Sequence, residues 1–178
     1  IALEGSDTFV VGLWHGWVLV KKWIIPKCTP KELVDFVNKI KTENGVSNSN
    51  IVYDADGVGA YVGGWVNGAK AFHNGGTPIK VDGVKENYEN LKTQCYFHLA
   101  AQINAGLCYW ACEMPEGAKD DLIEELEQVK RGDVKDGKLR LVSKEEVKKA
   151  IGRSPDLSDA LMMRFFFELD AAKRLPGM

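Results

Sequence analysis

The sequence predicts a single α/β domain built on a mixed β-sheet flanked by α-helices. An early apolar hairpin, an amphipathic helix directly after it, and short apolar segments alternating with further helices support this fold class. The chain has 178 residues, of which 45% are hydrophobic, and this is enough for one core of ordinary size. Because no repeat or long linker interrupts the pattern, residues 1–178 are expected to form one domain.

The N-terminal part predicts a hairpin followed by a helix. Thr8–Trp14 and Trp17–Ile25 have the pattern of strands, and the turn between them falls at His15-Gly16. Thr29-Pro30-Lys31-Glu32 is a capping box with proline at the first helical position. The helix that it opens should end near Asn44-Gly45, since glycine commonly follows the last helical turn.

The middle of the chain predicts two short strands around a glycine-rich segment. Ile51–Tyr53 is a short apolar strand that ends at Asp54, and residues 69–73 form another. Residues 57–67 are rich in glycine at first and then apolar, which favours a loop that leads into a helix.

The C-terminal half predicts mainly helices. Long helices are expected over residues 85–104 and 120–130, and the last helix begins at Ser154-Pro155. Asp136-Gly137 indicates a hairpin turn, with 139–142 as the returning strand. Ser143 then caps a short helix.

The composition makes some classes of protein less probable. The net charge is −2, from 23 basic and 25 acidic residues, which argues against a protein that holds DNA by its own charge. It does not argue against an enzyme in which bound cations supply the positive charge. No run reaches the roughly 20 apolar residues of a membrane span, and no secretory signal opens the chain. We therefore expect no membrane association.

The four cysteines are expected to be reduced thiols in a cytoplasmic protein, because none forms a CxxC pair and a chain of this length needs no disulfide. Cys95 and His98 are three residues apart and could form half of a zinc site. No second pair of ligands has the usual spacing, so packing on a partly buried helix is the preferred interpretation.

Asp54 is the first acidic residue that could carry chemistry. It follows an apolar strand, and the ends of strands are where α/β folds place ligands and metals. Gly57 and Gly59 come next, so that the backbone can approach a ligand closely. An aspartate at the entry to a helix explains the same pattern equally well.

Asp156 and Asp159 form a second acidic point at the start of the last helix. Residues three apart share a helical face, so both carboxylates could point to one site. The alternative is that they offset the helix dipole. If they converge with Asp54, the carboxylates could bind two divalent cations roughly 3.5–4 Å apart, the arrangement used in phosphodiester hydrolysis. Oxygen ligands of this kind suit Mg²⁺ or Mn²⁺.

Two other features have a functional and a structural interpretation. The glycine run 57–63 resembles a dinucleotide-binding fingerprint, but the acidic residue expected about twenty residues later is absent, since His73 to Gly76 lies there. A basic cluster that includes Lys144, Lys148 and Arg153 precedes Asp156. Such clusters are usually solvated surface, but this one could hold a phosphate backbone.

The motifs, taken in order, resemble the C-terminal nuclease domain of phage terminase large subunits. Residues 154–161, SPDLSDAL, are similar to the SPD-xx-DAL signature of that family, and IVYDADGVGAYV at 51–62 resembles its second strand and D-xx-GVGA turn. Further segments resemble the family in the same order, and these are residues 2–11, 72–76, 87–100 and 138–147. The resemblance therefore extends over nearly the whole chain.

The resemblance implies a ribonuclease-H-like nuclease that cuts concatemeric double-stranded phage DNA with two Mg²⁺ or Mn²⁺ ions. By position, Asp54 matches the acid of the second strand and Asp156 the acid at the start of the last helix. Asp159 is the neighbour of Asp156 that could ligate a metal or take the place of Asp156, and Asp7 matches a supporting aspartate. The family pattern places one more catalytic aspartate immediately before Ile1, so the first strand is expected to be truncated here.

The resemblance also implies partners and leaves two alternatives. The ATPase domain, the small subunit and the portal of the packaging motor are the implied partners, and the ATPase domain is expected to be absent from this sequence. A non-catalytic ribonuclease-H-like module that docks on the portal or the ATPase is the main alternative. A dinucleotide-binding domain is the third.

Overall fold

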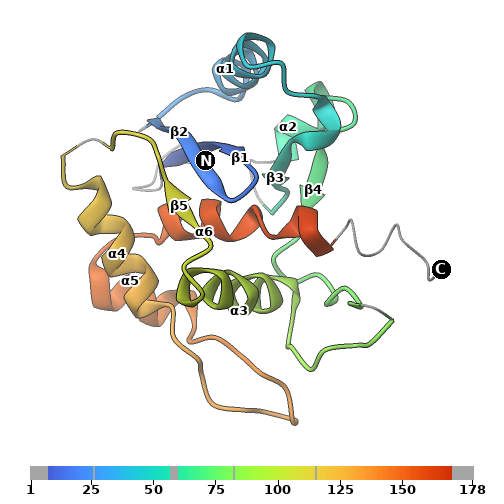
Figure 1. Ribbon diagram of the computed structural model, residues 1–178, viewed down its shortest axis with the longest axis vertical. Helices are drawn as coiled ribbons and strands as arrows, with labels where there is room; N and C mark the ends of the chain where they lie inside the picture. Colours follow the sequence, from blue (N-terminus) through green and yellow to red (C-terminus); the bar gives the residue numbers. More distant parts are fainter. Residues whose placement is uncertain (1–7, 26, 57–59, 82, 115, 170–178) are drawn as a thin grey trace.

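The computed structural model describes residues 8–25, 27–56, 60–81, 83–114 and 116–169. Within these residues the helices and strands follow one another in the order shown in Figure 1. They are β1 (Phe9–His15), β2 (Val18–Ile25), α1 (Pro30–Glu43), η1 (Asn48–Asn50), β3 (Val52–Asp54), α2 (Ala60–Trp65), β4 (Lys70–Phe72), α3 (Leu91–Asn104), β5 (Tyr109–Trp110), α4 (Ala118–Gln128), α5 (Lys144–Ile151) and α6 (Asp156–Met163). The mixed α/β class expected from the sequence is confirmed.

The strands form two sheets in the part of the chain that the structure describes. β1 and β2 are antiparallel and β5 pairs in parallel with β2, which gives the order β1-β2-β5. β3 and β4 pair in parallel, with Asp54 opposite Phe72. The parallel pairing brings the carboxyl ends of β3 and β4 together, so residues that follow the two strands meet at one sheet edge.

The hairpin and the two capped helices form where local chemistry predicts them. Gly16 has a φ of 58°, which glycine adopts easily in the tight turn between β1 and β2. Thr29 and Glu32 bond each other's backbone N–H groups at the start of α1. Ser143 and Glu146 do the same at the start of α5. All three predicted elements are confirmed.

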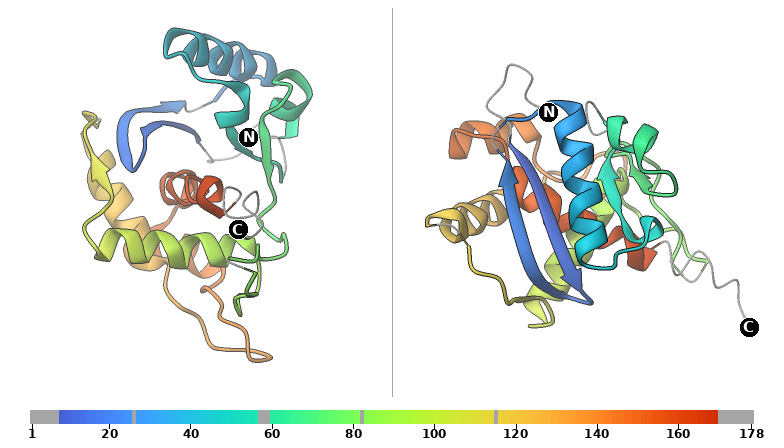
Figure 2. Two further views of the ribbon diagram at one scale, coloured as in Figure 1. Left: turned by 45° about the vertical axis from the view of Figure 1, so that its right-hand side comes forward. Right: turned by 90° about the horizontal axis from the view of Figure 1, so that it is seen from above.

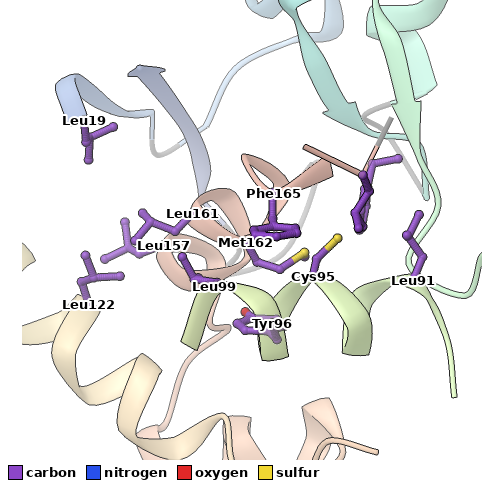
Figure 3. Packing of buried hydrophobic residues seen from close by; sticks show 12 residues of the cluster. Leu19, Leu91, Cys95, Tyr96, Leu99, Leu122, Leu157, Leu161, Met162 and Phe165 are labelled. Carbon is purple, nitrogen blue, oxygen red and sulfur yellow. The ribbon is translucent and has the colours of Figure 1, made fainter. Parts of the chain in front are cut away.

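Helix α6 lies at the centre of the molecule. It packs against α3 and α4 on one side and against β1 and β3 on the other. Figures 1 and 2 show α6, in red, between α3 below it and the strands above it. Its apolar residues Leu157, Leu161 and Met162 are buried in the main core with residues of α3 and α4, as Figure 3 shows. The N-terminal end of α6 is thereby held in place by several elements.

One helix boundary and two strands differ from the prediction. The helix expected over residues 85–104 begins at Leu91, because Asn90 caps it and the segment before it is tied to other loops. The returning strand expected at 139–142 is replaced by isolated bridges, although the turn at Asp136-Gly137 is present with positive φ at both residues. Strand β5 was not predicted, because it has only two residues and is defined by its pairing with β2 rather than by a sequence pattern.

A membrane-spanning helix would need a long apolar segment. No helix within the described residues is long and apolar enough for this.

Candidate functional site

A cavity of about 700 Å³ lies beside the N-terminal end of α6 and between β1 and β3. Residues of β1, α1, β3 and α6 line it, together with Lys144 at the start of α5. Asp54, Asp156 and Asp159 are all among the lining residues, although 102 positions separate Asp54 from Asp156. The fold therefore brings the sequence-predicted acids to one cavity.

Asp54 is held at the end of β3 by two hydrogen bonds, one from its own turn and one from the segment that follows β4. Its Oδ1 accepts from the backbone N–H of Asp56 at 2.9 Å and from Nδ2 of Asn74 at 3.1 Å. Asn74 reaches it because β4 runs parallel to β3 and ends beside it. Among the described residues Oδ2 of Asp54 makes no hydrogen bond or ion pair.

Asp56 also lines the cavity, and the sequence analysis did not single it out. Its Oδ2 accepts from the backbone N–H of Asn74 at 2.7 Å, and its Oδ1 lies 3.2 Å from Nδ1 of His73. Partial burial acts to raise the pKa of Asp56, but the bonds from Asn74 and His73 outweigh it and leave the pKa below its usual value. Asp56 thus links the end of β4 to the turn that holds Asp54.

Asp156 is the first residue of α6 and is tied to the start of β1. Its Oδ2 accepts from the backbone N–H of Thr8 at 2.8 Å and from Oγ1 of Thr8 at 3.3 Å. Within the described part of the chain its Oδ1 has no polar partner. The Asp156 carboxylate is therefore fixed through one oxygen, as the Asp54 carboxylate is.

Asp159 has a different environment, in which cations and a phenol already satisfy its oxygens. Oδ1 accepts from the Tyr96 hydroxyl and from Nζ of Lys92, both at 2.7 Å. Oδ2 lies 3.7 Å from Nζ of Lys144. Burial, and then the nearby Asp159 charge, raise the pKa of Tyr96 well above its usual value, so the phenol stays a donor. These contacts suit a residue that holds Lys92 and Lys144 in place better than a metal ligand.

The three basic candidates fall in different places. Lys144 lines the cavity, whereas Lys148 and Arg153 are not among its lining residues. The Arg153 guanidinium forms ion pairs with three carboxylates of α4, those of Asp121, Glu124 and Glu125. Its charge is thus already balanced by the protein.

The remaining predicted positions are Asp7, the glycine run and the Cys95–His98 pair. Asp7, Gly57 and Gly59 lie outside the described residues. Gly63 is explained by packing, because a Cβ there would lie 2.1 Å from the Tyr53 hydroxyl oxygen. Cys95 is buried, which raises its pKa to about 12. His98 is the other residue of the pair that could have formed half of a zinc site.

The contacts of the His98 side chain indicate a packing role. Its Nε2 lies 2.8 Å from Glu86, and its ring stacks on Phe165 with centroids 4.6 Å apart. Among the described residues, no group of three or more His, Cys, Asp or Glu side chains is arranged as a metal site.

The helix-flanked mixed sheets have the ribonuclease-H-like fold, which the solved terminase nuclease domains share. The chain is similar to the solved nuclease domain of the large terminase subunit gp2 of bacterial virus Sf6, with 25% identity and a TM-score of 0.69 over 90% of this chain and 82% of that one. The resemblance to phage terminase large subunits predicted from the sequence is confirmed.

Two further structures of the same Sf6 domain, both of a lysine-to-alanine mutant, are also similar. One was solved with calcium, at 26% identity and a TM-score of 0.72, and covers 90% of this chain and 83% of that one. The other contains manganese and beta-thujaplicinol, at 23% identity and a TM-score of 0.70, with the same coverage. No protein-family model and no curated protein sequence matches the chain.

Proposed function

We propose that this chain is the nuclease domain of a phage DNA-packaging terminase, and that it cleaves concatemeric double-stranded DNA by metal-dependent hydrolysis. The observation that carries the proposal is that Asp54 and Asp156, from separate elements, line one cavity of a ribonuclease-H-like fold. The calcium and manganese in the Sf6 structures support a site that takes divalent cations.

The donors in the cavity fit Mg²⁺ or Mn²⁺. Asp54 and Asp156 each have one carboxylate oxygen that accepts two hydrogen bonds and another without a polar partner among the described residues. Carboxylate oxygens are the ligands that these hard cations prefer. Two such ions, when bound, would activate a water molecule and stabilise the leaving oxygen of a phosphodiester. Asp54 and Asp156 would hold them, and Asp7 would support the site.

The remaining polar residues would prepare the cavity for DNA. Lys144 has its Nζ near Asp159 and at the cavity wall, where its charge would attract a backbone phosphate. Asp159 would keep Lys144 and Lys92 in position, and would become a metal ligand only if those contacts were exchanged. Lys148 and Arg153 stay candidates for contacts with the DNA backbone outside the cavity.

The proposed setting is the cytoplasm of an infected bacterium. There the domain would act with the ATPase domain, the small subunit and the portal of the packaging motor. With a net charge of −2, the chain should bind DNA weakly and in a salt-sensitive way by itself.

Nicking of supercoiled plasmid in Mg²⁺ or Mn²⁺ tests the proposal, with the chain extended upstream of Ile1. Asp54→Ala and Asp156→Ala should each lower the rate by about 100-fold or more, because each removes a candidate metal ligand. Glu127→Ala is the matched control, since Glu127 is exposed on α4. Unchanged nicking in both aspartate variants would exclude these residues from the mechanism.

A manganese soak of crystals separates this function from the main alternative. Ions bound between Asp54 and Asp156 support the nuclease. A cavity that stays empty of manganese supports the non-catalytic docking module, which the ion-paired state of Asp159 also favours.

A further inference from the structure

Glu125 in α4 is a carboxylate buried in the core. Its side chain is 2% exposed. Burying a carboxylate is costly unless hydrogen bonds or charges compensate for it. Burial indeed raises the pKa of Glu125 to about 7, even though Ser158 and Arg153 act to lower it. A residue this costly to bury needs a specific role.

The Glu125 carboxylate caps α6 from the neighbouring helix. Its Oε2 accepts a 2.7 Å hydrogen bond from the backbone N–H of Ser158, in the first turn of α6. The N-cap residue of α6 is Pro155, which makes no side-chain cap bond. The first N–H groups of a helix have no partner inside the helix, so Glu125 supplies an acceptor that the local sequence lacks. Arg153 Nε lies 3.7 Å from its Oε1.

Ser158 lies between the two acidic residues of α6, so what fixes it also fixes them. The Ser158 side chain is fully buried, and its Oγ lies 3.0 Å from the Tyr96 hydroxyl. The same hydroxyl donates to Asp159. Glu125 from α4 and Tyr96 from α3 therefore hold the inner side of the turn whose outer side presents Asp156 and Asp159 to the cavity.

We propose that Glu125 is a positioning residue of the nuclease site. By capping α6 from the neighbouring helix α4, it sets the directions of the Asp156 and Asp159 carboxylates. The link to metal binding rests on the proposed function. The capping role itself does not.

Three substitutions separate capping from charge and from simple packing. Glu125→Ala removes the acceptor, Glu125→Asp keeps the charge but withdraws it by one methylene, and Glu125→Gln keeps an acceptor oxygen without charge. Glu127→Gln on the exposed side of α4 is the matched control. All variants are compared at a temperature where circular dichroism shows them folded.

The first readout is amide hydrogen exchange without metal. Exchange of the Ser158 amide should become about tenfold faster in Glu125→Ala and Glu125→Asp, because neither variant places an acceptor oxygen within hydrogen-bond distance of this N–H. It should stay near the wild-type rate in Glu125→Gln and Glu127→Gln. Wild-type exchange in Glu125→Ala and Glu125→Asp would overturn the capping role.

The second readout is Mn²⁺ binding followed by electron paramagnetic resonance. The dissociation constant should rise about tenfold in Glu125→Ala and Glu125→Asp and recover in Glu125→Gln. Unchanged Mn²⁺ binding in Glu125→Ala, or a Glu125→Gln variant as poor as alanine, would overturn the positioning role. A wild-type protein that binds no Mn²⁺ would count against the proposed function, and the exchange experiment would still decide the cap.

Discussion

The two sides of the cavity hold their acids in contrasting ways. At the ends of β3 and β4, the hydrogen bonds of Asp54 and Asp56 among the described residues join residues at most 20 positions apart. The His73 and Asp56 side chains there are 63% and 47% exposed. At the start of α6, the contacts around Asp159 and Ser158 come from distant helices and are buried, with the Asp159 side chain 17% exposed. The same kinds of polar bond should therefore contribute little to stability on the first side and much on the second.

The largest effect is expected from the pH dependence of Glu125. Its pKa of about 7 in the folded protein is above its ordinary value of 4.5, so the folded state holds this proton more tightly than the unfolded state does. The associated stability is fully present below about pH 4.5 and is lost as the pH rises through about 7. Wild-type protein should lose on the order of 3 kcal/mol of unfolding free energy over this range relative to Glu125→Gln.

Urea unfolding at several pH values measures this difference. The charged groups that act on Glu125 or respond to its charge are Lys22 of β2, Arg153 and Asp156, so variants of these residues should shift the midpoint. Parallel pH profiles of wild type and Glu125→Gln would show that Glu125 does not titrate in this way, and would weaken the contrast between the two sides.

A smaller loss is expected from Tyr96→Phe. The change removes the buried hydroxyl that joins Ser158 to Asp159, and should cost about 1–3 kcal/mol of unfolding free energy. Tyr88→Phe is the control, because Tyr88 packs against the same helix α3 through its ring on Phe97. Equal stabilities of the two variants would mean that the buried network contributes nothing beyond packing.

The smallest effect is expected from His73→Ala on the exposed side. Its 3.2 Å contact with Asp56 is solvated, so the free energy of unfolding should change by no more than about 0.5 kcal/mol. Thermal unfolding at low and high salt checks this. A loss as large as that of Tyr96→Phe would contradict the proposed difference between the sides.

The same contrast explains what the sequence could and could not predict. The hairpin, both capping boxes and Asp54 at a strand end follow from neighbouring residues, and all were recognised. The roles of Tyr96 and Glu125 depend on partners 62 and 33 residues away, and no local pattern signals such pairs. Asp56 was missed because its partner Asn74 is 18 residues away and comes beside it only when β4 pairs with β3.

Helix boundaries failed for the same reason. Residues 85–90 have helical periodicity but are drawn into a loop by contacts with distant segments, such as the hydrogen bond from Glu89 N to the Leu139 carbonyl. The fold class, and the placement of Asp54, Asp156 and Asp159 along one cavity, were predictable because the order of motifs resembles a known domain. The buried hydrogen bonds of Tyr96 and Glu125 that hold α6 were not predictable.

The bond between Thr8 and Asp156 spans 148 residues. A nascent chain still on the ribosome cannot close the cavity until the last helix has emerged, because half of the acids are not yet made. Such a long loop must also be closed late in folding, since distant contacts form more slowly than local ones. An unfinished or prematurely terminated copy of this protein would therefore carry the hairpin and Asp54 at its strand end, but not the cavity that α6 completes.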